Sequence, residues 1–186
     1  MAMPVAVPRY TVDDLESFPD DGNRYELLDG VLLVSPAPSF LHEIVVQRIR
    51  DQLIAYLGKT ARVLTRGAVQ IPPRTQLEPD LLVIPGTVRV TRKTTWSDVR
   101  DWWLAVEVSG RGSRIYDRDA KQPAYPRLGV REAWRADLGD CCIEVTRQGQ
   151  DNVTRYVDQL TWHPPEMPHP LVIDIPAGFQ GIEGDD

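Results

Sequence analysis

The sequence is poor in cysteine, and its two cysteines, Cys141 and Cys142, are neighbours. Adjacent side chains of a strand point to opposite faces, so this pair predicts neither a disulfide nor a metal-binding set. The sequence also has no CxxC pattern, which argues against a structural zinc site. We therefore expect both cysteines to be packing residues in a reducing compartment.

Long hydrophobic runs are also absent. No segment approaches the ~18 consecutive apolar residues that a membrane-spanning helix needs, and the start of the chain lacks the basic and apolar regions of a signal peptide. The expected location is the cytoplasm. With 186 residues, 42% of them hydrophobic, the chain is long enough for one domain with its own core. We expect that domain over residues 10–180, between an N-terminal tail (1–9) and an acidic C-terminal tail (181–186).

Positive charge is scarce overall but unevenly spread. The net charge of −6 argues against a nucleic-acid coat protein, which is usually basic. Residues 88–135, however, carry 11 Lys and Arg against 6 Asp and Glu, whereas residues 136–186 carry 2 against 10. Because local charge governs the attraction of a focused anionic ligand, the basic stretch is a candidate contact surface. A solvated charged face would give the same pattern.

Hydrophobic periodicity predicts three helices. The longest begins after Ser39 and ends at Gly58. A short helix is expected over 11–18, with Thr11 as its N-cap. A third is expected over 117–128, although prolines interrupt it.

Short apolar runs predict the strands. Two of them flank Asp29-Gly30, a strong hairpin signal. The predicted strands are 24–28, 31–35, 61–71, 80–85, 102–108, 131–138, 141–148 and 152–159, with a short edge strand in 169–179. The order predicts an α/β fold of the α+β type, with a central mixed β-sheet flanked by helices and an N-terminal hairpin. Neither GxGxxG nor GxxxxGK[ST] is present, which disfavours a Rossmann or P-loop protein.

Two apolar strands carry acids where packing would favour leucine. Asp80 opens "DLLVI" and Glu107 lies within "AVEVS". An ionised carboxylate buried without a partner costs several kcal/mol, so each must be paired, protonated or bound to a cation. A shared Mg²⁺ or Mn²⁺ would satisfy both. The alternatives are that Asp80 caps a turn and that Glu107 forms a structural ion pair with an arginine.

A lysine follows these acids along the chain. Lys121 comes four residues after Asp117, on the same face of a helix that begins there. Beside a metal-activated water, a lysine can orient the nucleophile or stabilise charge that develops on a phosphate. Lys121 taken alone fits a surface lysine equally well.

Three blocks of the sequence resemble a known family. They are "YELLDGVLLVSPAPSFLHEIVVQRI", "EPDLLVIP" and "LAVEVSGRGSRIYDRDAKQPAYPRLGVREAW". With the strand-rich ending, they resemble the Uma-type family of bacterial restriction endonucleases, in the PD-(D/E)XK nuclease superfamily. The resemblance covers roughly residues 10–180. It implies a restriction-endonuclease-like core and an endonuclease that uses Mg²⁺ or Mn²⁺.

The resemblance also assigns roles to residues. Asp80, after Pro79, and Glu107 match the metal-binding carboxylates. The superfamily lysine two places after the glutamate is replaced by Ser109, and a lysine on the following helix matches Lys121.

Two further family positions match Glu26 and His42. Glu26 would supply a third carboxylate, and His42 would assist the water or the phosphate unless it only packs at a helix start. Tyr125 is expected to orient Lys121. A helix start displaced by Pro123 would instead place Lys121 on a loop.

Three functions are compatible with these observations. The first is a metal-dependent endonuclease whose basic stretch contacts DNA, expected to be double-stranded. A homodimer is a further expectation, because double-strand cleavage needs two sites. The second is a non-catalytic relative that uses the site as a regulatory or partner-binding surface. The third and weakest is a carboxylate-pair hydrolase of sugars, which needs two acids ~5–10 Å apart in a cleft.

Overall fold

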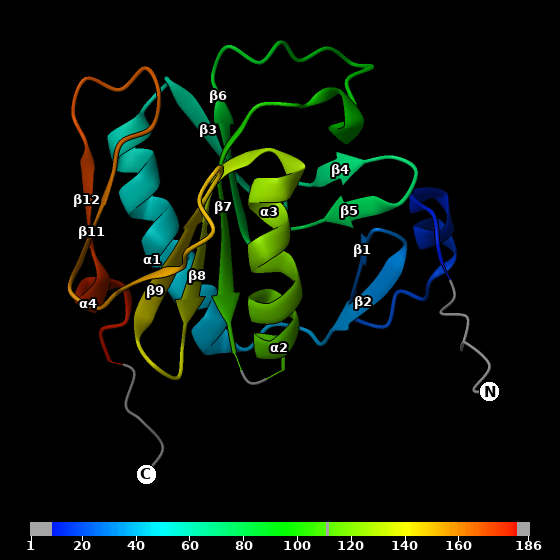
Figure 1. Ribbon diagram of the computed structural model, residues 1–186, viewed down its shortest axis with the longest axis horizontal. Helices are drawn as coiled ribbons and strands as arrows, with labels where there is room; N and C mark the ends of the chain where they lie inside the picture. Colours follow the sequence, from blue (N-terminus) through cyan, green and yellow to red (C-terminus); the bar gives the residue numbers. More distant parts are fainter. Residues whose placement is uncertain (1–8, 111, 182–186) are drawn as a thin grey trace.

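A six-stranded sheet forms the centre of the molecule (Figure 1). The computed structural model describes residues 9–110 and 112–181. The strand order is β10-β9-β8-β7-β6-β3. Only β7 and β8 run parallel, and the other neighbours in this sheet are antiparallel. The strands are β3 (Ala61–Thr65), β6 (Leu81–Pro85), β7 (Trp102–Ser109), β8 (Val130–Asp137), β9 (Cys142–Arg147) and β10 (Thr154–Tyr156). The predicted α/β class with a central mixed sheet is confirmed.

The helix α1 (Phe40–Leu57) covers one face of this sheet. The Ser39 side chain caps its start by accepting a hydrogen bond from the His42 N–H at 3.2 Å. Gly58 ends the helix, as predicted, with a positive φ of 53°. Apolar residues of α1 and of β7, such as Val106, share one hydrophobic core. The cap therefore places His42 at the end of α1 beside the sheet.

The helix α3 (Gln122–Leu128) covers the other face of the sheet (Figure 1). A second hydrophobic core joins Ala124 and Tyr125 of this helix to Ala105 of β7. Side chains alternate along a strand, so Glu107 points to the same face as Ala105. The carboxylate thus lies on the side that α3 covers.

The prediction of one strand over 61–71 is wrong. The segment forms β3 and then β4 (Val69–Ile71), which belong to different sheets. The chain turns at Arg66, whose φ is 55°. At Gly67, a Cβ would lie 3.0 Å from Leu82, so the turn packs tightly on β6. The segment 72–79, for which no strand was predicted, contains a further strand, β5 (Thr75–Leu77).

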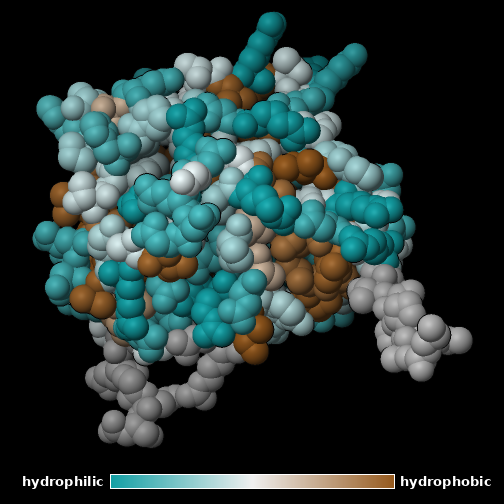
Figure 2. Space-filling model, in the orientation of Figure 1, coloured by the Kyte–Doolittle hydropathy of each residue, from teal (hydrophilic) through white to brown (hydrophobic). Residues whose placement is uncertain are grey.

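The hairpin β1 (Arg24–Leu28) and β2 (Val31–Ser35) has the predicted bounds. It joins β4 and β5 in a four-stranded sheet of order β2-β1-β5-β4. Figure 2 shows a hydrophobic patch over this hairpin on an otherwise largely hydrophilic face. Val31 and Val34 are among its exposed apolar residues.

The remaining elements are short. The predicted helix at 11–18 is the 3₁₀ helix η1 (Val12–Ser17), and a second one is η2 (Trp96–Asp98). The segment predicted as one strand at 152–159 holds β10 and the start of β11 (Gln159–Trp162), which pairs with β12 (Leu171–Asp174). The chain continues into α4 (Ile175–Gly178).

Several predictions concern features outside these elements. Both cysteines are free, as expected. Within residues 9–110 and 112–181, no helix has the length and apolar character needed to cross a membrane. Most of the two predicted tails, 1–8 and 182–186, lies outside the described residues.

Candidate active site

Two neighbouring strands bring Asp80 and Glu107 together. The register that pairs Leu81 with Val106 continues to place Asp80 opposite Glu107. The N–H of Val108 donates a hydrogen bond to Asp80 Oδ2 at 2.8 Å. Both carboxylates are buried, with 5% and 3% exposure. The two acids that stood out in apolar strands therefore share one buried location.

Asp80 is held by two side chains from other elements. Arg24 Nη1 of β1 lies 3.0 Å from Oδ1, and His42 Nε2 of α1 lies 3.0 Å from Oδ2. Burial alone would raise the pKa of Asp80. The hydrogen bond with His42, the charge of Arg24 and the N–H of Val108 outweigh it and hold this pKa below its usual value. Asp80 is thus an ionised carboxylate at neutral pH.

Lys121 lies at the centre of three carboxylates. Its Nζ contacts Glu26 Oε2 directly and lies 3.4 Å from both Glu107 Oε1 and Asp117 Oδ1. Its side chain is only 1% exposed, so it is not a surface lysine. Burial alone would lower the pKa of Lys121, but the negative charges of Glu107, Glu26 and Asp117 raise it above its usual value. The ammonium group is therefore permanently charged.

A π-helical turn positions Lys121. The segment α2 (Arg114–Tyr116), the π turn η3 (Asp117–Lys121) and α3 form one continuous helical stretch. The N–H of Gln122 donates to the carbonyl of Asp117, five residues earlier. Pro123 lacks an N–H, and its ring would clash with the carbonyl four residues before it in an α-helix. The wider turn before Pro123 avoids this clash, so Lys121 stays on a helix rather than a loop.

Tyr125 contacts Glu107 rather than Lys121. Its hydroxyl donates to Glu107 Oε1 at 2.5 Å. Burial raises the pKa of Glu107 well above its usual value, and the negative charges of Asp117, Asp80 and Glu26 add to this, although Lys121 opposes it. We expected Tyr125 to orient Lys121 directly. Instead, Tyr125 and Lys121 both contact the carboxyl group of Glu107, so any effect of Tyr125 on the lysine is indirect.

These groups surround a cavity of about 720 Å³. Its lining includes His42, Asp80, Glu107, Asp117 and Lys121. Glu26 does not line it, and reaches it only through its contact with Lys121. A second bond fixes Glu26, whose Oε1 accepts from the Glu78 N–H at 2.7 Å.

The five residues singled out in the sequence (Asp80, Glu107, Lys121, Glu26 and His42) thus lie in one network. Two further members were not assigned roles. The spacing of Asp117 from Lys121 was a usable signal, and Ser109 Oγ donates to Asp117 Oδ2 at 3.0 Å. Arg24 had no such signal, because it meets Asp80 only through the packing of two sheets.

The network holds more carboxyl groups than cations. Four buried carboxylates contact Lys121 or Arg24, which are the two permanently charged cations of the cluster; these acids are Glu26, Asp80, Glu107 and Asp117. Burial raises the pKa of Glu26 and of Glu107, so protonation can balance the charge, whereas a bound divalent cation would keep these acids ionised. Carboxylate oxygens are the ligands that Mg²⁺ and Mn²⁺ prefer. Among residues 9–110 and 112–181, no three or more His, Cys, Asp or Glu are arranged as a complete metal site. The fit therefore rests on two protein carboxylates, with waters completing the shell.

Comparisons with known proteins identify the family and the fold of this chain. The family model described as "Uma2: Putative restriction endonuclease" matches residues 12–182. A crystal structure described as "a putative nuclease belonging to DUF820", from Anabaena variabilis, superposes with a TM-score of 0.72. Its sequence is 13% identical, over 93% of this chain and 99% of that chain, so this likeness shows a shared fold.

A search of curated proteins gave no significant match. The family model, however, spans nearly the whole chain and confirms the family predicted from the sequence blocks. The chain belongs to the Uma2 family, and its family and fold together indicate a nuclease.

Proposed function

We propose that this protein is a divalent-metal-dependent DNA endonuclease that hydrolyses phosphodiester bonds. The observation that carries the proposal is the cluster of four buried carboxyl groups with Lys121 and Arg24 beside the cavity. Asp80 and Glu107 would hold Mg²⁺ or Mn²⁺. When bound, the ion would lower the pKa of water and polarise the phosphate.

The protein side chains have distinct tasks in this proposal. Lys121 lines the cavity with a fixed positive charge, so it can stabilise negative charge that develops on the phosphate. Glu26 is fully buried outside the cavity and positions Lys121 without touching the substrate. Tyr125 fixes the Glu107 carboxyl group through the hydrogen bond that its hydroxyl donates.

His42 lines the cavity beside Asp80. Its Nε2 is engaged with Asp80, and the ring lines the cavity at 9% exposure. An imidazole in this position can accept a proton from the attacking water or pass one to the leaving oxygen. It also fixes the orientation of the Asp80 carboxylate.

Plasmid cleavage in Mg²⁺ or Mn²⁺ tests the proposal. Asp80→Asn keeps the size of the side chain but removes its charge, and we expect a loss of cleavage of roughly 10²-fold or more. Asp51→Asn, at an exposed position of α1, is the matched control and should cleave as the wild type does. Melting curves of both variants check folding. Equal cleavage by the wild type and Asp80→Asn rejects the assignment.

A second candidate function is a non-catalytic nuclease-fold protein that uses the site for regulation or partner binding. It is favoured by the ion pairs, because Asp80 and Glu107 each already contact a basic side chain of the protein. Calorimetric titration with Mn²⁺ separates the two candidates. The non-catalytic candidate is supported if Mn²⁺ gives no heat of binding and if the affinity for DNA is the same with and without the metal.

A further inference from the structure

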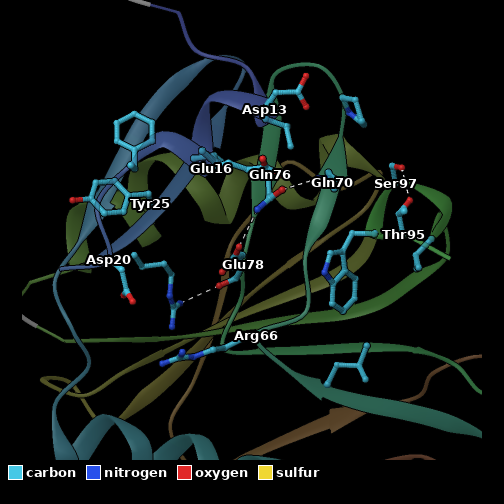
Figure 3. Close-up of a pocket in the computed structure, with 18 of the residues that line it drawn as sticks. Asp13, Glu16, Asp20, Tyr25, Arg66, Gln70, Gln76, Glu78, Thr95 and Ser97 are labelled. Carbon is cyan, nitrogen blue, oxygen red and sulfur yellow. Dashed lines mark hydrogen bonds between the residues drawn. The ribbon is translucent and has the colours of Figure 1, made fainter. Parts of the chain in front are cut away.

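A second cavity is larger than the one at the carboxylates. It has a volume of about 1570 Å³ and lies between η1, the strands β3 to β5 and the connector 86–101 (Figure 3). Small-molecule pockets span about 300–1,000 Å³, so this groove suits part of a polymer better. Arg24, Pro36 and Pro38 line both cavities. The groove therefore adjoins the candidate active site.

Basic side chains lie on one side of the groove and on the segment next to it: Arg66 lines the groove, whereas Arg89, Arg92 and Lys93 are not among its lining residues. The connector lines it through residues such as Val90 and Thr94, and carries exposed Arg89, Arg92 and Lys93 along the same segment. Arg66, at the end of β3, lines the groove directly and is also exposed (Figure 3). None of these four basic side chains forms an ion pair with another described residue. They are free to contact an anionic backbone.

The opposite side is acidic. Asp13 and Glu16 of η1 line the groove away from Arg66 in the close-up, and Asp20, which follows η1, lines it nearer to Arg66 (Figure 3). These carboxylates disfavour a phosphate on their side but accept hydrogen bonds from exocyclic amino groups of bases. The two sides would thus orient a nucleic-acid strand across the groove.

The floor between the two sides carries an ordered chain of amides. Gln70 and Gln76 are directly opposed on β4 and β5. Gln70 Nε2 donates to Gln76 Oε1 at 2.7 Å, and Gln76 Nε2 donates to Glu78 Oε1 at 3.0 Å (Figure 3). Each amide nitrogen retains a second N–H, so the floor presents donors in a fixed orientation. Glutamine amides in such positions recognise base edges.

We propose that this groove binds the DNA that flanks the cleaved bond, with its phosphates on the cationic side and its bases over Gln70 and Gln76. Trp96, which is partly exposed at the rim, offers a face on which a base can stack. The proposal rests on the proposed function, because the DNA enters the active site past Arg24. Gln70 and Gln76 then determine a base preference next to the cut.

Binding of a labelled DNA duplex to the full chain in EDTA tests the cationic side without cleavage. We expect Arg66→Asn and the double variant Arg92→Gln, Lys93→Gln to weaken binding and to reduce the slope of log Kd against log salt by about 1 per charge removed. Asparagine tolerates the positive φ of position 66. Arg155→Gln, on β10 at the opposite edge of the central sheet, is the control and should leave the slope unchanged.

Base preference is read by sequencing the oligonucleotides that the protein retains from a random pool. Gln76→Leu should change the enriched bases, whereas Gln159→Leu, on β11, should not. The proposal that the groove binds DNA is overturned if the salt slope is unchanged in the variants of basic residues, or if the enriched bases are unchanged in Gln76→Leu. This holds even if the protein cleaves plasmid. Retention of RNA or a peptide in place of DNA overturns it as well. If the groove variants change DNA binding as expected but the protein does not cleave plasmid, the groove is a DNA-binding site and the endonuclease proposal fails.

Discussion

Lys121 is the residue on which the buried network depends. It is the cation that contacts Glu26, Glu107 and Asp117, and its side chain is shielded from water. In such a cluster the attraction between charges is strong, but each group has lost its hydration. Removal of the shared cation therefore leaves three buried carboxylates without their main counter-charge.

Replacement of Lys121 by methionine tests this dependence. Because methionine fills a similar volume without charge, we expect Lys121→Met to lower the free energy of unfolding by about 3–5 kcal/mol at neutral pH. Urea denaturation measures the loss. Lys59→Met, at an exposed lysine after α1, is the matched control and should stay within about 0.5 kcal/mol of the wild type.

The pH dependence of the same variant gives a second readout. Burial already raises the pKa of Glu26 and of Glu107, and loss of Lys121 removes the charge that opposes this. A carboxyl whose pKa is higher in the folded state than in the unfolded state stabilises the fold at low pH and less so as pH rises. Lys121→Met should thus be closest to the wild type near pH 4 and furthest from it near pH 8. A pH-independent difference contradicts the account.

The sequence predicted the acidic members of the site for a physical reason. Asp80 and Glu107 stood out because a carboxylate in an apolar strand requires a partner, and this requirement can be read locally. The partners themselves are set by tertiary packing. Arg24 meets Asp80 across 56 positions of the chain, and nothing around Arg24 in the sequence distinguishes it from a surface arginine.

At the scale of elements, a proline sets the geometry of the lysine helix. Pro123 lies in the first turn of α3, and the π turn before it ends at Lys121. The sequence indicated a conflict between helical periodicity and proline, and left open a later start of the helix at Pro123. The π turn resolves the conflict by another route, because one wider turn accommodates the ring while the helix continues.

Pro123→Ala should separate stability from activity. Alanine restores an N–H and removes the ring clash, so the turn over 117–121 can relax towards α-helical geometry and rotate Lys121. We expect a melting temperature equal to or above that of the wild type. Plasmid cleavage should fall by roughly 10²-fold, because a small displacement of a catalytic group can reduce the rate by that factor. Cleavage at the wild-type rate would show that the π turn is not needed to place Lys121.

The strands show where local patterns are insufficient. The segment 61–71 alternates as one strand would, yet it divides between two sheets at Arg66 and Gly67. The cause is tertiary, since Gly67 packs against Leu82 of β6 and redirects the chain. By contrast, α1 and the β1–β2 hairpin were predicted with the bounds that they have, because Ser39, Gly58 and Asp29-Gly30 are local signals.

At the scale of the whole molecule, the basic stretch 88–135 is less exposed to DNA than its net charge implies. Several of its arginines pair with acids of the same protein: Arg118 with Asp119 at 2.7 Å, Arg127 with Asp29 at 2.8 Å, and Arg131 with Asp101 at 2.9 Å. Arg89, Arg92 and Lys93 of the connector form no ion pair with another described residue. The net charge of a segment therefore overstates the surface that it offers to a polyanion, and its arrangement decides where DNA can bind.

Residues 9–110 and 112–181 hold one cluster of the kind described, so under the proposed function one chain would cut one strand per encounter. Relaxation of supercoiled plasmid to nicked circles should be first order in protein, whereas linear DNA should appear later and rise more steeply with concentration, because two copies must act on opposite strands. The unpaired edge of β2, with its exposed valines, is one surface where copies could meet. Gel quantification over a range of protein concentrations measures the kinetic order in protein for the nicked and for the linear product. Sedimentation velocity at the same concentrations reports the assembly state. Linear DNA that forms first order and without a nicked intermediate, from a protein that sediments as a monomer, would contradict a single cut per chain.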